Sequence, residues 1–79
     1  MIEPGVPNYR SGQRIKTAVD VINDDSFPTV PPGGVLVRAG RIGEIIRVRM
    51  HTEANVPIYL VDFGEQLIIG CFEDEIKAL

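Results

Sequence analysis

The sequence contains one cysteine and no tryptophan, and no apolar run approaches the ~20 residues that a membrane-spanning helix needs. The lone cysteine, Cys71, cannot form an internal disulfide, although small secreted domains usually depend on several. Residues 1–13 also lack the continuous apolar segment of a signal peptide. The sequence therefore predicts a soluble, cytoplasmic protein that does not enter a membrane.

Basic residues are scarce relative to acidic ones, because 8 Lys and Arg against 11 Asp and Glu give a net charge of −3. Nucleic-acid binding draws most of its affinity from clustered Lys and Arg, so this balance argues against a nucleic-acid groove. Four arginines do gather in the middle of the chain: Arg38, Arg41, Arg47 and Arg49. They occupy odd and even positions of expected strands, which point to different faces, and we interpret them mainly as solvated strand positions.

The chain is too short for a deep active-site pocket. Its 79 residues form one domain, and a domain of this size buries about 60% of the surface that its unfolded chain exposes. The composition, 44% hydrophobic and 24% charged, is that of a folded globular domain with a thin core. No nucleophile–base pair or cofactor loop is visible, so we expect no catalytic residue, no cofactor and no enzymatic activity.

Period-two alternation marks a first strand beginning at Gln13. Its inward positions share one parity: Ile15, Thr17, Val19 and Val21. The preceding residues mix Pro, Gly, Asn and Ser without any period. We therefore divide the chain into an N-terminal arm, residues 1–12, and a barrel domain, residues 13–79, and order in the arm would require a partner or a docking surface.

The segment from Asn23 to Gly34 is a long loop dense in turn formers, with three of the six prolines. Phe27 and Val30 are large apolar residues inside it, and burying them would pin the loop against the barrel. Two interpretations stay open: a loop that is merely tied down by these two anchors, or a loop whose edge forms a docking groove for a partner.

Two glycines, Gly40 and Gly43, predict a bend or bulge at which one strand running from Val35 to Met50 turns a barrel corner. They do not form a dinucleotide-binding loop, because the third glycine and the following helix are missing. His51 to Pro57 has the polarity of a hairpin loop, and Gly64-Glu65 reads as a two-residue hairpin turn between apolar runs.

The segment from Phe72 to Ile76 is too short for an amphipathic helix, and its acidic residues suit a single helical turn before a closing strand. Several short strands without any sustained helical period imply an all-β fold. We expect a small SH3-like barrel of about five strands, with a long loop after the first strand and a short helical turn near the C-terminus.

Four short blocks also carry a family resemblance: Val21 to Pro28, Leu36 to Gly43, Ile58 to Phe63 and Ile69 to Ile76. In order and spacing they resemble the NifZ family of nitrogen-fixation accessory proteins, over residues 12–76. The sequence departs from the family pattern at three positions. Asp25 stands where glycine is usual, Phe72 where a basic residue is common, and Asp62 where a histidine often precedes the aromatic.

The resemblance implies a chaperone or assembly factor that assists maturation of the nitrogenase molybdenum-iron protein and formation of its iron–sulfur P-cluster, with no catalytic residues to carry over. The implied partner is that protein or a related metalloprotein client. An alternative is the variable chain of ferredoxin-thioredoxin reductase, an SH3-like scaffold subunit of an iron–sulfur enzyme. That family has a similar glycine-marked strand and acidic closing turn but lacks the Asn23-to-Pro28 block. In both cases an acidic barrel docks on a larger protein.

We expect partner binding at the long loop and at two arginines that follow it: Asn23, Asp24, Asp25, Phe27, Pro28, Arg38 and Arg41. Cys71 is a candidate reactive thiol, although a lone cysteine at the end of an apolar strand is more often a small buried hydrophobe. The donors that could join it in a metal site, His51 and residues 73–75, lie on separate elements. We therefore expect no metal site.

Overall fold

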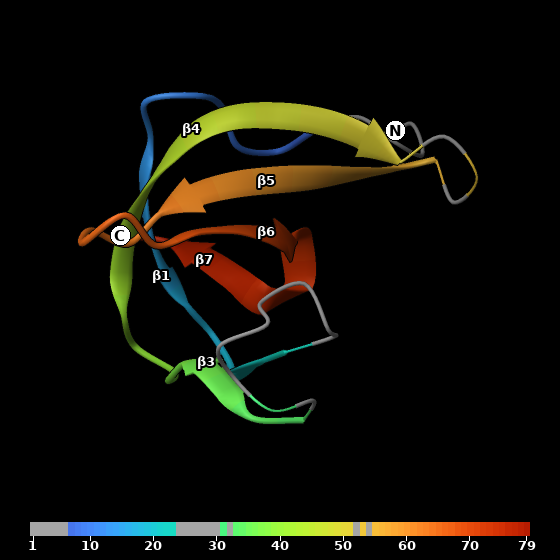
Figure 1. Cartoon of the computed structure of the whole chain (residues 1–79). Coiled ribbons are helices and arrows are strands. Elements are labelled where there is room, and N and C mark those ends of the chain that lie inside the picture. Colours follow the sequence, from blue (N-terminus) through green and yellow to red (C-terminus); the bar gives the residue numbers. More distant parts are fainter. Residues whose placement is uncertain (1–6, 24–30, 32, 52, 54) are drawn as a thin grey trace.

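The structure, a computed structural model, describes residues 7–23, 31, 33–51, 53 and 55–79 (Figure 1). Its elements are short strands and one 3₁₀ turn: β1 (Arg14–Thr17), β2 (Val21–Ile22), β3 (Val35–Val37), β4 (Ile42–His51), β5 (Val56–Asp62), β6 (Ile68–Phe72), η1 (Glu73–Glu75) and β7 (Ile76–Ala78). The predicted all-β fold class and the short helical turn near the C-terminus are therefore confirmed.

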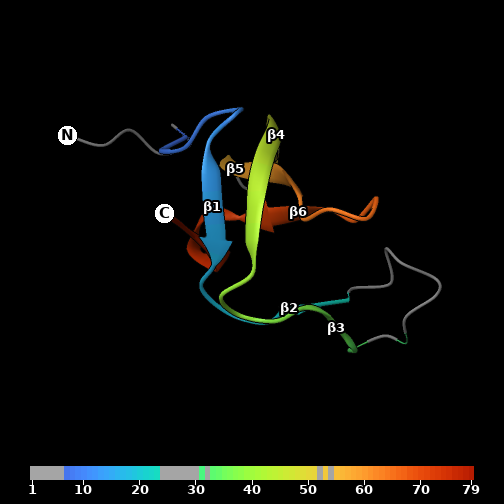
Figure 2. The same ribbon diagram turned by 90° about the vertical axis from the view of Figure 1, so that its left-hand side faces the viewer.

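Five of the strands form one antiparallel sheet in the order β6-β5-β4-β1-β7, and β2 pairs with β3 in a separate ribbon. The sheet curves strongly, and the ribbon extends from its lower end between β1 and β4 (Figures 1 and 2). This order has the predicted features of an SH3-like barrel: two successive hairpins, a long excursion after the first strand, and a closing strand beside β1. Among the described residues β6 does not pair with β7, so the barrel is partly open.

The core lies on the concave side of the sheet and follows the period-two alternation of the strands. On β5 every second residue is buried, namely Pro57, Tyr59 and Val61, and the neighbouring strand β6 buries Ile69 and Cys71. The remaining core residues come from every other part of the fold: Ile15, Val21, Val37, Ile45, Phe63 and Ile76. A bulge at Ile46 shifts the register between β4 and β5, so the alternation of β4 changes phase there.

The first strand is shorter than predicted. It ends at Thr17, and Val19, expected to face inward, is 46% exposed. Two side chains hold the bend: the Thr17 hydroxyl donates to the Arg38 carbonyl at 2.8 Å, and the Asp20 carboxylate accepts the Ala39 N–H at 2.7 Å. Such side-chain-to-backbone bonds compete with strand pairing, and here they split the expected strand into β1 and β2.

The expected bent strand from Val35 to Met50 is also two strands. β3 ends at Val37 and β4 begins at Ile42, with Gly40 between them at a φ of 88°. The Gly40 N–H donates to the Thr17 carbonyl at 2.8 Å, which ties this turn to the bend after β1. The glycine-marked change of direction was thus predicted correctly, but it is a turn that a left-handed residue permits and not a continuous strand.

The hairpin between β5 and β6 is longer than the predicted two-residue turn. Gly64, Glu65 and Gln66 all have positive φ values, and the Phe63 N–H donates to the Leu67 carbonyl at 2.9 Å. The second strand begins only at Ile68. The hairpin between β4 and β5, in contrast, lies within the predicted segment, although β4 extends to His51 and Pro57 belongs to β5.

Candidate functional site

The β2–β3 ribbon carries the predicted partner-binding loop. Asn23, at its base, is 3% exposed, and its backbone closes the loop: its N–H donates to the Gly34 carbonyl at 2.8 Å, and its carbonyl accepts the Gly33 N–H at 3.0 Å. The Asn23 amide also donates to the Pro31 carbonyl at 3.4 Å. Asn23 is thus a buried residue whose hydrogen bonds join the two ends of the loop. Four other predicted residues lie outside the described part of the chain: Asp24, Asp25, Phe27 and Pro28.

The two predicted arginines, Arg38 and Arg41, border one open depression of about 500 Å³ that is lined by residues 35–41. Both are exposed, and the Arg41 guanidinium donates to the Phe63 carbonyl at 3.0 Å, which anchors that side chain to the main sheet. The structure therefore brings these two residues together beside β3. On the same ribbon, Ile22 and Val35 are cross-strand partners and are 48% and 41% exposed.

Cys71 lies in the core on β6 and is 0% exposed. Burial, together with repulsion from the Glu75 carboxylate, raises the pKa of its thiol to about 12. The neutral thiol lies 3.9 Å from the Ile69 carbonyl, a weak contact. A buried thiol with a raised pKa carries almost no thiolate near neutral pH, and thiolate is the form that attacks electrophiles or ligates metals.

Replacing Cys71 with alanine is expected to lower the free energy of unfolding by about 1 kcal/mol, because it trims a small buried group. In the native wild-type protein the thiol should react with a disulfide reagent only after unfolding, which a colorimetric thiol assay with and without urea measures. Rapid reaction of the thiol in the native state would support a functional thiol instead.

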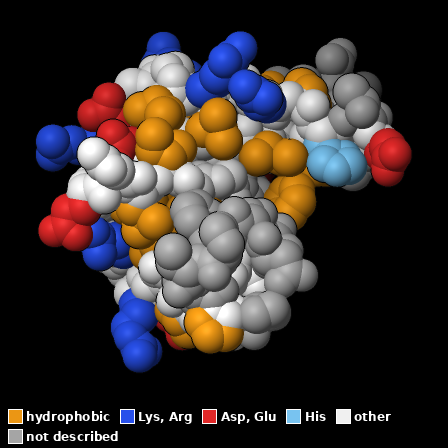
Figure 3. Space-filling model, viewed as in Figure 1, with side chains coloured by type: hydrophobic (Ala, Val, Ile, Leu, Met, Phe, Trp, Pro, Cys, Tyr) orange, Lys and Arg blue, Asp and Glu red, His pale blue; other side chains and the backbone are white. Residues whose placement is uncertain are grey.

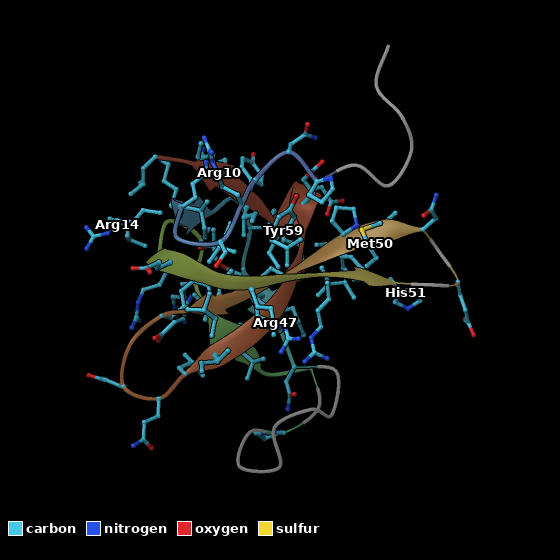
Figure 4. The ribbon with its side chains drawn as sticks, turned by 90° about the horizontal axis from the view of Figure 1, so that it is seen from above. Arg10, Arg14, Arg47, Met50, His51 and Tyr59 are labelled. Atoms are coloured by element: carbon cyan, nitrogen blue, oxygen red, sulfur yellow. The ribbon has the colours of Figure 1, made fainter. Side chains whose placement is uncertain are left out.

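A polar cluster links the N-terminal segment to the barrel, and sequence reasoning did not identify it. The Tyr59 hydroxyl donates to Glu73 Oε1 at 2.7 Å and accepts the N–H groups of Asn8 at 3.1 Å and Tyr9 at 3.3 Å. The Asn8 side-chain amide donates to Glu73 Oε2 at 2.8 Å. Tyr59 points toward the N-terminal segment that carries Arg10 (Figure 4).

An aromatic contact reinforces this cluster, since the rings of Tyr9 and Tyr59 meet edge to face with centroids 5.5 Å apart. Order in the N-terminal segment was expected to require a docking surface. For residues 8 and 9 the barrel provides that surface through Tyr59 and Glu73. The one signal in the sequence was the polar hydroxyl of Tyr59 at an inward-facing position of β5, because a buried hydroxyl needs a partner.

The cluster shifts the pKa values of both titratable members. Burial raises the pKa of Tyr59 to about 12, and its hydrogen bond to Glu73 adds to the effect. Burial also pushes the Glu73 pKa upward, but the hydrogen bonds donated by Tyr59 and Asn8 outweigh it and hold that pKa below its ordinary value. Glu73 is therefore ionised and Tyr59 neutral at physiological pH, the state in which a hydroxyl donates to a carboxylate.

The acidic turn is an ordered structural element as well. The Glu75 carboxylate accepts the Phe72 N–H at 2.7 Å, which closes η1 at its start. In the described part of the chain, no three His, Cys, Asp or Glu side chains come close enough together to hold a metal ion. None of the helical residues described forms a segment long and apolar enough to cross a membrane.

Comparison with known proteins gives the family. The model of the NifZ domain matches residues 6–78. Among curated proteins, "Protein NifZ" of Azotobacter vinelandii is 31% identical over 72 residues, covering 90% of this chain and 45% of the relative. "Protein NifZ" of Azotobacter chroococcum mcd 1 is 29% identical and that of Frankia alni is also 29% identical, with 45% and 37% of those proteins covered.

The chain thus spans less than half the length of the curated relatives it matches. No solved structure gives a significant match. Because the family model covers nearly the whole barrel and the segment that docks on it, including the Asn8 and Tyr9 contacts, the resemblance inferred from the four sequence blocks is confirmed. The chain belongs to the NifZ family.

Proposed function

We propose that this protein is a nitrogen-fixation accessory protein that binds a nitrogenase component as an assembly factor and does not itself catalyse a reaction. The client that we propose is the molybdenum-iron protein during maturation of its P-cluster. The observation that carries the proposal is the NifZ domain match over residues 6–78. Because the chain spans less than half of its curated relatives, the client and the step are inferences for this chain.

The geometry favours a binding role on an exposed surface. The ribbon presents the apolar pair Ile22 and Val35 next to the long loop, and Arg38 borders an open depression beside it. A rigid sheet that carries a long loop is the usual arrangement for recognition, since the scaffold fixes the loop ends while the loop supplies contacts. We place this activity in the cytoplasm.

Affinity capture from nitrogen-fixing cells tests the proposal. The tagged protein should retain the molybdenum-iron protein, and it should retain more of it from cells in which P-cluster maturation is blocked than from cells with mature nitrogenase. Retention of an iron–sulfur reductase subunit, with no nitrogenase component in either extract, would contradict the proposal and promote the reductase-scaffold alternative.

The acidic residues of the loop supply a prediction about kinetics. Changing Asp24 and Asp25 together to Asn should leave the thermal midpoint nearly unchanged but slow association with the client and weaken its salt dependence, because exposed charges chiefly steer encounter. Stopped-flow or surface-based kinetics at low and high salt measure this. The matched control is E53Q/D74N, which removes two exposed acidic charges elsewhere. Equal association rates for both variants would place the docking face outside the loop.

A further inference from the structure

The convex side of strands β5 and β6 is apolar where a solvated sheet face is normally polar. Four side chains form what we call the apolar outer face: Ile58 and Leu60 on β5, and Ile68 and Phe72 on β6. Ile68 is 44% exposed and Phe72 is 46% exposed, while Ile58 and Leu60 are half-buried. Antiparallel strands with one solvated face usually alternate apolar and polar residues, whereas near-continuous apolar strands are typical of sheets covered on both faces.

The strand register assembles these residues and places two arginines beside them. Leu60 lies opposite Gly70 on one side and Arg47 on the other. In the next row of this face, Ile58 lies opposite Phe72 and Arg49. Two rows thus cross three strands, and each begins with an exposed arginine on β4. The first row continues into Leu60 and ends at Gly70, and the second continues into Ile58 and ends at Phe72.

The figures agree with this arrangement. Arg47 lies on the opposite side of the β4–β5 hairpin from Tyr59, which belongs to the core (Figure 4). Hydrophobic side chains gather next to basic side chains on the face of the molecule that includes β4 and β5 (Figure 3).

Gly70 supplies no side chain to the apolar outer face, and the neighbouring side chains of β5 lie close to it. A Cβ at this position would lie 3.3 Å from Ile58 Cγ2 and 3.7 Å from Leu60 Cδ2, so both aliphatic side chains already fill part of the space above the glycine. Gly70 is exposed and supplies no side chain of its own. An apolar side chain of a partner that sits over Gly70 would contact aliphatic groups on one side and the Phe72 ring along the strand.

The charges beside this face indicate the chemistry of the partner. The chain as a whole carries a net charge of −3, yet the two rows begin with Arg47 and Arg49. Glu44 and Asp62 are cross-strand neighbours in the row of Ile68, at the far end of β5 from Ile58, and the acidic turn Glu73–Glu75 follows Phe72 at the β6 end of the Ile58 row. Carboxylates of a partner would therefore be attracted to the β4 side of the two arginine rows and repelled from the Glu44–Asp62 row and from the acidic turn, which favours one orientation.

We propose that the apolar outer face binds an acidic, apolar segment of a partner protein. The apolar side chains of that segment lie over Gly70 and against Leu60 and Phe72, and its carboxylates pair with Arg47 and Arg49. The inference rests on the proposed function only in taking the client to be a protein. It adds a surface on β5 and β6, distinct from the β2–β3 ribbon.

A peptide titration of the full chain, followed by amide chemical shifts, tests this assignment without nitrogenase. The probe is a short peptide of alternating leucine and glutamate, compared with one of alternating leucine and lysine. We expect only the glutamate peptide to change the amide chemical shifts of β5 and β6, and we expect added salt to lower its affinity. R47E/R49E should lower its affinity about tenfold, whereas R10E/K77E, with the same change in net charge, should not.

A second variant, L60S, keeps both arginines and should also lower the affinity for the glutamate peptide. It provides a test of the proposal if R47E/R49E does not fold. The assignment is overturned if the shifts map elsewhere, if both peptides bind equally, or if the two charge-reversal variants lose affinity equally. It is also overturned if a single-stranded oligonucleotide displaces the peptide and binds L60S as well as wild type, which would reveal simple anion binding. A positive peptide result with failed nitrogenase capture would overturn the proposed client alone.

Discussion

Replacing Gly43 with alanine is expected to lower the free energy of unfolding by about 2–3 kcal/mol, the scale on which overpacking destabilises a well-filled core. Gly43 faces inward on β4, and a Cβ there would lie 2.6 Å from Val61 Cγ1 and 2.8 Å from Phe63 Cδ1. Val61 is 0% exposed and Phe63 is 5% exposed, so neither has free space into which to move. Urea unfolding followed by circular dichroism should show a lower midpoint with an unchanged slope.

The matched control is Gly70→Ala, on the neighbouring hairpin. There the added methyl group meets only Ile58 and Leu60, which are half-buried side chains on the convex side of the sheet. We expect its stability to stay within about 0.5 kcal/mol of wild type, as for most surface substitutions. Equal losses for the two variants would mean that close packing at Gly43 does not hold β4 against β5.

Tyr59→Phe is expected to lower the free energy of unfolding by about 2 kcal/mol, because it removes a hydrogen bond to a charged group and an acceptor for two backbone N–H groups, of which only the Asn8 N–H keeps a second acceptor, Glu73 Oε1 at 3.0 Å. The hydroxyl contacts Glu73, Asn8 and Tyr9, so its loss should also release the N-terminal segment. Hydrogen exchange at the Asn8 and Tyr9 amides measures that release. Tyr9→Phe is the control, because Tyr9 joins the cluster through its backbone and its ring.

The same cluster predicts a pH dependence with a defined sign. The folded-state pKa of Glu73 is lowered, so the unfolded chain binds the proton more readily near its ordinary pKa of about 4.3. The stability that Glu73 contributes is present above that pH and is lost as the pH falls through the folded-state pKa. E73Q should flatten this acid limb of the stability profile. At alkaline pH the raised Tyr59 pKa predicts a loss of stability above about pH 10, which Y59F should lack.

Strands that are marked by apolar runs and turn residues were predictable from sequence, and those shaped by distant side chains were not. β5 and β6 are apolar runs on either side of a glycine turn, and the acidic turn lacks the length for a helix, so all three elements were located, although β6 begins two residues later than predicted. The predicted end of β1 was wrong because the Thr17 hydroxyl donates a hydrogen bond to the Arg38 carbonyl, 21 positions away. Local alternation at Val19 and Val21 contains no sign of that contact.

The candidate site shows the same division. Asn23 was selected as a surface contact from its turn-rich surroundings, but its side chain is buried and its backbone closes the loop. The Tyr59 cluster was missed because its partner Asn8 lies 51 positions away, in a segment without periodicity. The apolar outer face was missed because an apolar residue at an outward position looks, in sequence, like a fully buried strand.

The most direct test of the central claim, that this barrel is a nitrogenase-binding accessory protein, is the affinity of the purified protein for the molybdenum-iron protein in two states. Isothermal titration should give measurable binding to molybdenum-iron protein isolated before P-cluster maturation and weaker binding, by about tenfold or more, to the mature form. Equal affinity for both forms would contradict a role in assembly. Absence of binding to either form would contradict the claim that nitrogenase is the client.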